Sequence, residues 1–183
     1  MGIMPRFDVE KARKPKKPKG GKQVPVEVVV QRAVERLALP EPVIRTSPDE
    51  ELAQVVHLPT WMWVEHSRWR PVSVAAEVDG VRVTATARPR RAVWSMGDGG
   101  QVVCQGPGTP YSAAYDPRSS SPTCGHTYHR ATMTLPGRAY TVSVRVTWDV
   151  EWRGGGETGV VPGLVMTGER QLVVDEVQTV VTR

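Results

Sequence analysis

The amino-acid sequence predicts an all-β protein, a sandwich of antiparallel strands of roughly 120 residues. The strongest signal is the segment 140–152, where every even position is apolar and every odd position is polar. This alternation is typical of a long strand with one buried face and one solvated face. A second signal is the pair of alternating segments 72–78 and 81–87, separated by Asp79 and Gly80. That dipeptide favours a two-residue hairpin turn.

Residues 1–24 are predicted to form a disordered basic arm. They carry eight lysines and arginines against two acidic residues, a net charge of +6, whereas the rest has 16 basic and 17 acidic residues, a net charge of −1. Segment 10–24 mixes Pro, Gly and Lys without apolar periodicity, so it buries too little surface to offset the entropy of ordering. The arm either contacts an anionic wall polymer, a membrane or a nucleic acid, or it is a solvated linker or a mis-assigned start, and we favour the second interpretation.

The charge distribution and hydropathy argue against two classes of partner. The positive charge belongs to the arm and does not form a basic patch on a folded surface, so we expect no nucleic-acid partner. No apolar window of the sequence approaches the length that a membrane span needs, so we expect no transmembrane segment. No signal peptide is visible at the N-terminus of this chain.

Residues 25–60 are predicted to contain a helix and a Pro-rich connector. Apolar residues recur at three- and four-residue steps after Pro25, which suits the first helical position, and Pro40 closes the run. The Ser-Pro-Asp-Glu sequence at 47–50 resembles a helix N-cap, so a second short helical turn is expected through about residue 55. The connector spans 39–48.

Residues 61–183 are predicted to form the sandwich. A last candidate strand, 171–182, follows a loop of three glycines at 154–156. Near the start stand Trp61, Trp63 and Trp69, which have two interpretations. They either stack on a sugar or anchor a partner from an exposed surface, or they pack the N-terminal segment onto the sandwich.

Three separated motifs occur in order within this region. They are Trp-Ser-Met-Gly-Asp-Gly at 94–99, His-Thr-Tyr at 126–128 and Gly-Arg-Ala-Tyr-Thr-Val-Ser-Val at 137–144. They resemble the polycystic kidney disease (PKD) domain, whose signature is W-D-F-G-D-G, then H-x-Y, then G-x-Y-x-V-x-V. The resemblance covers roughly residues 72–182 and implies an immunoglobulin-like sandwich.

The resemblance has departures and extensions. Ser95 and Met96 replace the usual Asp and Phe, and a Cys-bounded insertion separates the first two motifs. The Leu-Pro-Thr-Trp-Met-Trp segment at 58–63 and the Cys pair further resemble PKD-containing secreted or envelope proteins of actinobacteria. The resemblance therefore implies a location outside the cell or in the envelope. The motif residues for which it implies a structural role are Trp94, Gly97, Asp98, Gly99, His126, Tyr128, Gly137 and Tyr140.

The segment 94–99 is either a metal or substrate site or a turn. In the frame of the resemblance, Trp94 and Met96 point into the core. The two glycines accept backbone angles that a Cβ would resist, and Asp98 hydrogen-bonds turn amides. We therefore favour a turn. The resemblance also implies that His126 hydrogen-bonds within the fold.

Cys104 and Cys124 enclose a loop, 105–123, that is rich in Gly, Pro and Ser. The pair is either a disulfide, two free thiols, or the source of a nucleophile with His126 as its base, oriented by Asp98 or Asp116. No sequence context of a cysteine enzyme surrounds them. We favour a disulfide, worth on the order of 3 kcal/mol for a loop of this length.

The four histidines do not predict a metal site. His126 and His129 stand three apart, which on a strand places them on opposite faces, so they do not converge on one ion without a bend. No cofactor motif occurs, and we expect no cofactor.

The sequence therefore predicts a non-catalytic extracellular or cell-envelope module that binds a protein or a cell-wall glycan. Tyr111 and Tyr115 in the insertion and the tryptophans at 61–69 are the predicted contact residues. The alternative is an accessory domain of a hydrolase, or a cryptic hydrolase, that uses Asp98 and His126. We do not expect an enzyme, because the sequence has no acid pair, nucleophile elbow or metal-ligand spacing.

Overall fold

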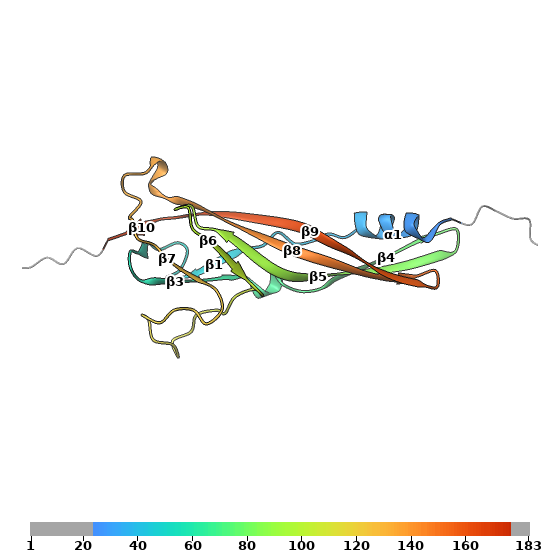
Figure 1. Ribbon diagram of the computed structural model, residues 1–183, viewed down its shortest axis with the longest axis horizontal. Helices are drawn as coiled ribbons and strands as arrows, with labels where there is room; N and C mark the ends of the chain where they lie inside the picture. The colour runs from blue at the N-terminus through green and yellow to red at the C-terminus, as the bar shows by residue number, and fades with distance from the viewer. Residues whose placement is uncertain (1–23, 177–183) are drawn as a thin grey trace, which may run out of the picture.

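The computed structural model describes residues 24–176. The predicted basic arm lies outside the described residues except for Val24. The described chain is an elongated body built mostly from β-strands with one α-helix (Figure 1), so the all-β prediction is confirmed. No helix in this part of the chain is long and apolar enough to cross a membrane. The elements are α1 (Val26–Glu35), β1 (Ile44–Ser47), β2 (Gln54–Val55), β3 (Pro59–Val64), η1 (His66–Arg68), β4 (Val72–Val78), β5 (Val81–Ser95), β6 (Gln101–Cys104), β7 (Gly125–Thr127), η2 (Pro136–Arg138), β8 (Tyr140–Gly154), β9 (Glu157–Leu172) and β10 (Val174–Asp175).

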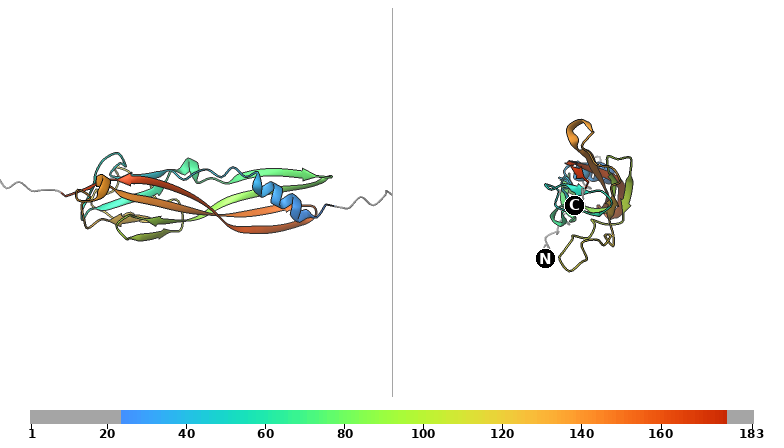
Figure 2. Two further views of the ribbon diagram at one scale, coloured as in Figure 1. Left: turned by 90° about the horizontal axis from the view of Figure 1, so that it is seen from above. Right: turned by 90° about the vertical axis from the view of Figure 1, so that its left-hand side faces the viewer.

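A long antiparallel sheet runs the length of the molecule in the order β4-β5-β8-β9, and β6 also pairs with β5. Its strands twist strongly about one another (Figure 2). The predicted hairpin is confirmed, since β4 and β5 join through Asp79 and Gly80, both with positive φ. Positive φ at both central residues is the geometry that matches the right-handed twist of the flanking strands.

The alternating pattern at 140–152 is buried on one face, as predicted. The even positions from Tyr140 to Val150 are all buried, and Trp152 is half-buried. The pairing of β5 with β8 shifts register around Pro89. Proline donates no backbone hydrogen bond, so it is accommodated in a paired strand at such an irregularity.

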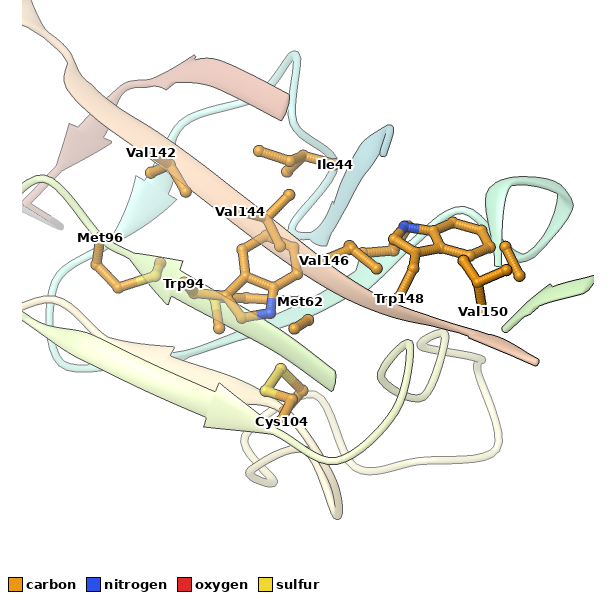
Figure 3. Packing of buried hydrophobic residues seen from close by; sticks show 14 of the residues in the cluster. Ile44, Met62, Trp94, Met96, Cys104, Val142, Val144, Val146, Trp148 and Val150 are labelled. Carbon is orange, nitrogen blue, oxygen red and sulfur yellow. A yellow bond between two sulfur atoms is a disulfide. The ribbon is translucent and has the colours of Figure 1, made fainter. Parts of the chain in front are cut away.

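A second, smaller sheet in the order β1-β3-β7 lies at one end of the long sheet. Met62 of β3, Trp94 of β5 and Val144 of β8 are fully buried where the two sheets meet (Figure 3). At the other end α1 packs on β4 and β5. Both ends contribute to one continuous hydrophobic core.

The predicted first helix is confirmed, with bounds Val26–Glu35. Its apolar stripe faces the sheet, as the three- and four-residue spacing requires. The buried residues of the stripe are Val26, Val29, Val30 and Ala33.

The second helical turn, predicted up to residue 55, is wrong. The predicted connector supplies strand β1, and β1 and β2 are joined by a turn in which Asp49 accepts a hydrogen bond from the Glu51 N–H at 2.9 Å. The Gln54 side chain donates to carbonyl groups of the same turn. Such side-chain bonds to the backbone compete with helix formation, so Ser-Pro-Asp-Glu starts a turn here.

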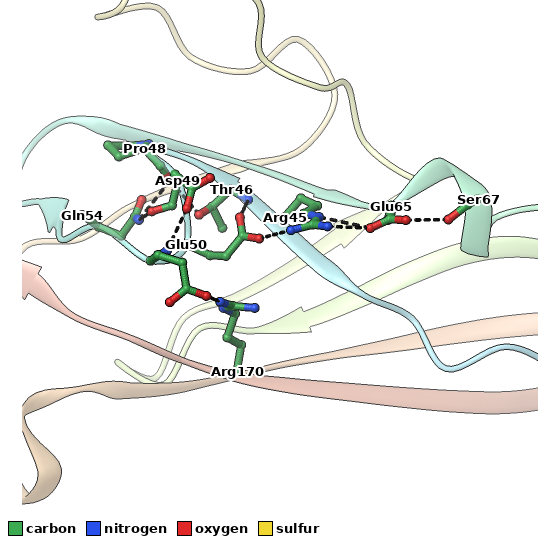
Figure 4. A network of polar contacts seen from close by, with 10 residues as sticks. Arg45, Thr46, Pro48, Asp49, Glu50, Gln54, Glu65, Ser67 and Arg170 are labelled. Carbon is green, nitrogen blue, oxygen red and sulfur yellow. Dashed lines mark hydrogen bonds and ion pairs between the residues drawn. The ribbon is translucent and has the colours of Figure 1, made fainter.

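A polar network holds this turn against β1 (Figure 4). Arg45 donates to Glu50 and Glu65, and the Glu50 carboxylate also accepts the Thr46 N–H at 3.2 Å. Burial raises the pKa of Glu50, but hydrogen bonds from Arg45 and from the backbone lower it more, so the pKa is below its usual value. The network therefore holds Glu50 ionised although its side chain is buried.

The last predicted strand has different bounds. Pairing with β8 begins at Glu157, directly after the glycine turn, and continues to Leu172. The following strand, β10, pairs in parallel with β2. Residues 177–182 of the prediction lie outside the described residues.

Candidate interaction site: the disulfide-bounded loop and the turn beside it

The insertion 105–123 leaves the body between β6 and β7 and projects away from it (Figure 1). Cys104 ends β6, and Cys124 immediately precedes β7. The two are joined by a disulfide, with their Cα atoms 5.7 Å apart, and both are buried. The described residues contain no free cysteine. Cys104 is therefore not a thiolate nucleophile for His126.

Backbone hydrogen bonds fix the two ends of the insertion to β3. The Val64 N–H donates to the Pro107 carbonyl at 2.7 Å, and the Met62 N–H donates to the Cys124 carbonyl at 3.1 Å. Gly108 has a positive φ, and a Cβ there would overlap the Met62 carbonyl oxygen. This close approach requires glycine and seats the start of the loop on β3.

An aromatic cluster ties the middle of the insertion to the body. The Tyr111 and Tyr115 rings lie 5.3 Å and 4.7 Å from the ring of Trp61, measured between centroids. The Trp61 indole N–H donates to the Ser119 carbonyl at 2.7 Å. Trp61 is 2% exposed, so it packs against the loop. Of the two interpretations of the tryptophans, this burial favours packing over direct contact with a partner for Trp61.

The tip of the insertion is exposed but locally ordered by its own hydrogen bonds. Asp116 accepts a hydrogen bond from the Arg118 N–H at 2.8 Å, and its carbonyl accepts one from the Ser119 N–H at 2.9 Å. Residues 112–118 are all exposed, and Tyr115 keeps 40% of its surface in solvent. The loop therefore presents exposed side chains on a hydrogen-bonded backbone.

The other two predicted tryptophans lie apart from this tip. Trp63 is half-buried on β3, where its Cα and Cβ lie against Gly108 at the base of the loop. Trp69 follows η1 and packs, half-buried, against the main core. The structure thus brings Trp61 together with the two predicted tyrosines but leaves Trp69 elsewhere.

The segment 94–99 is a turn beside the base of the insertion. Trp94 and Met96 are fully buried, as predicted. Gly97 has φ 80°, and a Cβ there would lie 2.8 Å from the Tyr140 Cβ. Asp98 accepts the Gly100 N–H at 2.8 Å, which is the predicted bond to a turn amide.

The three motifs meet around this turn. The Asp98 carboxylate lies 2.7 Å from the His126 Nε2, which donates to it. The Tyr128 hydroxyl donates to the Met96 carbonyl at 3.2 Å, and its ring stacks on Tyr140 with centroids 5.2 Å apart. Each contact joins residues far apart in the sequence.

Gly137 also has a positive φ, 73°, within η2 directly before β8. Glycine adopts this left-handed conformation without the steric cost that a Cβ brings. Its place supports the structural role that the resemblance implies for it.

The Asp98–His126 pair has the hydrogen bond of a catalytic dyad but no nucleophile bonded to it among residues 24–176. Burial raises the pKa of Asp98, but hydrogen bonds from His126 and the Gly100 N–H lower it more, so the pKa is below its usual value. The side chains of His126 and Asp98 are only 16% and 18% exposed. Within residues 24–176, His126 makes its side-chain hydrogen bond to Asp98, and no hydroxyl or thiol is bonded to it. A nucleophile for a catalytic triad is missing from this arrangement.

Burial raises the pKa of Tyr128, and the nearby negative charge of Asp98 raises it further. The phenol is therefore neutral at physiological pH and serves as a hydrogen-bond donor to the turn. This hydrogen bond is consistent with the structural role that the resemblance implies for Tyr128.

One pair of residues escaped sequence reasoning. The rings of His57 and His129 meet at the surface, with their Nδ1 atoms 3.3 Å apart. The two lie 72 positions apart, and no local pattern joins them. Among residues 24–176, no group of three or more His, Cys, Asp or Glu side chains is placed to hold a metal ion.

Comparisons with known proteins give no match, whether with family models, curated proteins or solved structures. The PKD resemblance therefore rests on the three motifs alone and stays a prediction.

Proposed function

We propose that the chain is a non-catalytic interaction module that binds a protein partner through the exposed tip of the 105–123 loop. The main support is that the disulfide and backbone hydrogen bonds to β3 fix the base of the loop, while its tip is exposed. A loop ordered before binding loses less conformational entropy on association. This lowers the cost of recognition through residues 112–118.

The chemistry of the tip favours a protein over a glycan. The loop combines tyrosine with Ser and Gly, residue types that antibody loops use for protein recognition. It projects from the body (Figure 1), whereas small-ligand sites are concave. A cell-wall glycan is the other outcome of the test below.

We further propose that the fold is an immunoglobulin-like sandwich of the PKD type located outside the cell or in the envelope. Two observations support the fold: two antiparallel sheets pack over Trp94, and the three motifs meet at one turn. The disulfide supports the location, because disulfides persist in oxidising compartments.

The test uses the full chain with a photoreactive amino acid at Ala113, displayed to cell-surface fractions of the source organism. Glu77, exposed on β4, is the matched position for the control. We expect discrete protein adducts from position 113 and none from position 77. Equal adducts from both positions, or none from 113, would overturn the proposal.

A charge reversal checks the same interface without disturbing the fold. Arg118 contributes only its backbone N–H to the loop, so Arg118→Glu should weaken the position-113 adducts and leave the melting temperature unchanged. Arg153→Glu, exposed on β8, is the control. Co-sedimentation with purified cell wall in place of protein adducts would identify a glycan partner instead.

The hydrolase alternative is kept because Asp98 and His126 are in hydrogen-bond contact. It predicts a hydrolytic activity of the parent protein on esters, peptides or glycans that is lost in both Asp98→Asn and His126→Ala. If such an activity is found and both variants remain folded, the non-catalytic proposal is wrong.

A further inference from the structure

His57 and His129 form a pair that neither the motifs nor the loop explain. Their rings lie 5.3 Å apart between centroids and are inclined by 52°. Both side chains are exposed, so burial does not force them together. Their two Nδ1 atoms face each other at 3.3 Å.

The backbone, rather than ring contact alone, sets this juxtaposition. The His57 N–H donates to the Tyr128 carbonyl at 2.8 Å, which places residue 57 beside the residue that precedes His129. The Leu58 N–H donates to the Val55 carbonyl at 3.2 Å across the same turn. These backbone hydrogen bonds therefore fix the positions from which the two imidazole rings project.

The distance between the two nitrogen atoms matches one edge of a metal tetrahedron. A tetrahedral ion with metal–nitrogen bonds of about 2.0–2.1 Å separates two ligand nitrogens by about 3.3–3.4 Å. Imidazole nitrogen is a ligand that suits Zn²⁺, Cu²⁺ and Ni²⁺. When both rings carry their proton on Nε2, each Nδ1 has a lone pair with which to bind an ion.

We propose that His57 and His129 form a two-histidine site for a divalent transition-metal ion of the Zn²⁺ and Cu²⁺ class, bound through both Nδ1 atoms. The remaining coordination positions fall to water. His57 and His129 lie 72 positions apart on different segments, so, unlike His126 and His129, they are not kept apart by alternation along one strand. The inference is independent of the proposed partner-binding function.

The ion has an open path to this site. The side chains of His57 and His129 are both exposed, so an ion reaches them directly from solvent. Since no third His, Cys, Asp or Glu among residues 24–176 completes a metal cluster, binding is expected to be reversible rather than structural.

The test is a Zn²⁺ titration of the full chain without a histidine tag, followed by calorimetry and by ¹⁵N chemical shifts of the imidazole rings. We expect one ion per chain, with the Nδ1 shifts of His57 and His129 changing and those of His66 unchanged. His57→Asn and His129→Ala should each weaken binding about 10–100-fold or more, since each removes one of two protein ligands.

The variants are chosen so that folding does not confound the result. Asparagine tolerates the positive φ of residue 57, which is 65°. His66→Ala removes another exposed histidine and should bind Zn²⁺ as the parent does. No binding by the parent, or binding that survives both pair substitutions, would overturn the proposal, and near-ultraviolet circular dichroism checks that each variant is folded.

Discussion

Replacing Trp94 by alanine tests the packing of the core most directly. Trp94 is fully buried on β5 between the two sheets (Figure 3). It is also the first residue of the first motif, so the same change tests whether the motif is structural. We expect a large loss in the free energy of unfolding.

The magnitude follows from the buried area and from one unpaired donor. A buried tryptophan removes about 150–250 Å² from water, which at about 25 cal/mol per Å² is worth roughly 4–6 kcal/mol. The indole Nε1 has no hydrogen-bond partner among residues 24–176. Its removal relieves a desolvation penalty of about 1–3 kcal/mol. The difference is about 1–5 kcal/mol, and the cavity left by the ring adds to it, so Trp94→Ala should cost about 3–5 kcal/mol, as large core truncations do.

Trp94→Phe separates the two contributions. Phenylalanine keeps much of the apolar contact and removes the unpaired donor, so it should cost less than about 2 kcal/mol. Urea unfolding of the disulfide-bonded protein, followed by tryptophan fluorescence and circular dichroism, measures both values. If Trp94→Ala unfolds at the same urea concentration as the parent, the residue does not support the core and the reasoning is refuted.

Two further predictions concern the disulfide and the turn. Thiol counting under denaturing, non-reducing conditions should find no free thiol in protein made in an oxidising compartment; two thiols would contradict the Cys104–Cys124 bond. Asp98→Asn should lower the free energy of unfolding near neutral pH by roughly 1–3 kcal/mol. Because folding lowers the pKa of Asp98, its contribution is present above about pH 4 and is lost as the pH falls through the lower folded-state value. The difference between parent and variant should then close in acid, and a gap that persists there would contradict this origin.

Local patterns predicted the regular elements well. The alternation at 140–152 predicted the long strand and its buried face, and Asp79-Gly80 predicted the hairpin. These signals work because a strand with one buried face imposes a period of two on its own sequence. The helix before them likewise shows its buried stripe in its own spacing.

The errors arose where side chains compete with the backbone or where distant segments pair. Ser-Pro-Asp-Glu at 47–50 has the composition of both a helix cap and a turn, and the side chains of Asp49 and Gln54 stabilise the turn. Strand β1 is short and pairs with β3 across 20 positions at its start, Ile44 with Val64. The hydrophobic periodicity of so short a segment does not predict that it pairs with a distant strand.

The candidate site was predicted in part for the same reason. Gly97 adopts a positive φ and Asp98 accepts a backbone N–H of its own turn, and both roles follow from the residue type. The packing of Trp61 under Tyr111 and Tyr115 depends on how the insertion folds back, which composition does not specify. The facing of His57 and His129 depends on the pairing of residue 57 with residue 128, and sequence gives no signal for it.

The lengthwise arrangement of the body has a mechanical consequence. The described chain begins beside α1 at one end and leaves through β10 at the other (Figure 1), so tension on its two flanks acts along the long axis. The strands β8 and β9 run along that axis, and their hydrogen bonds stand across it. A load in this direction shears many bonds at once instead of opening them one by one.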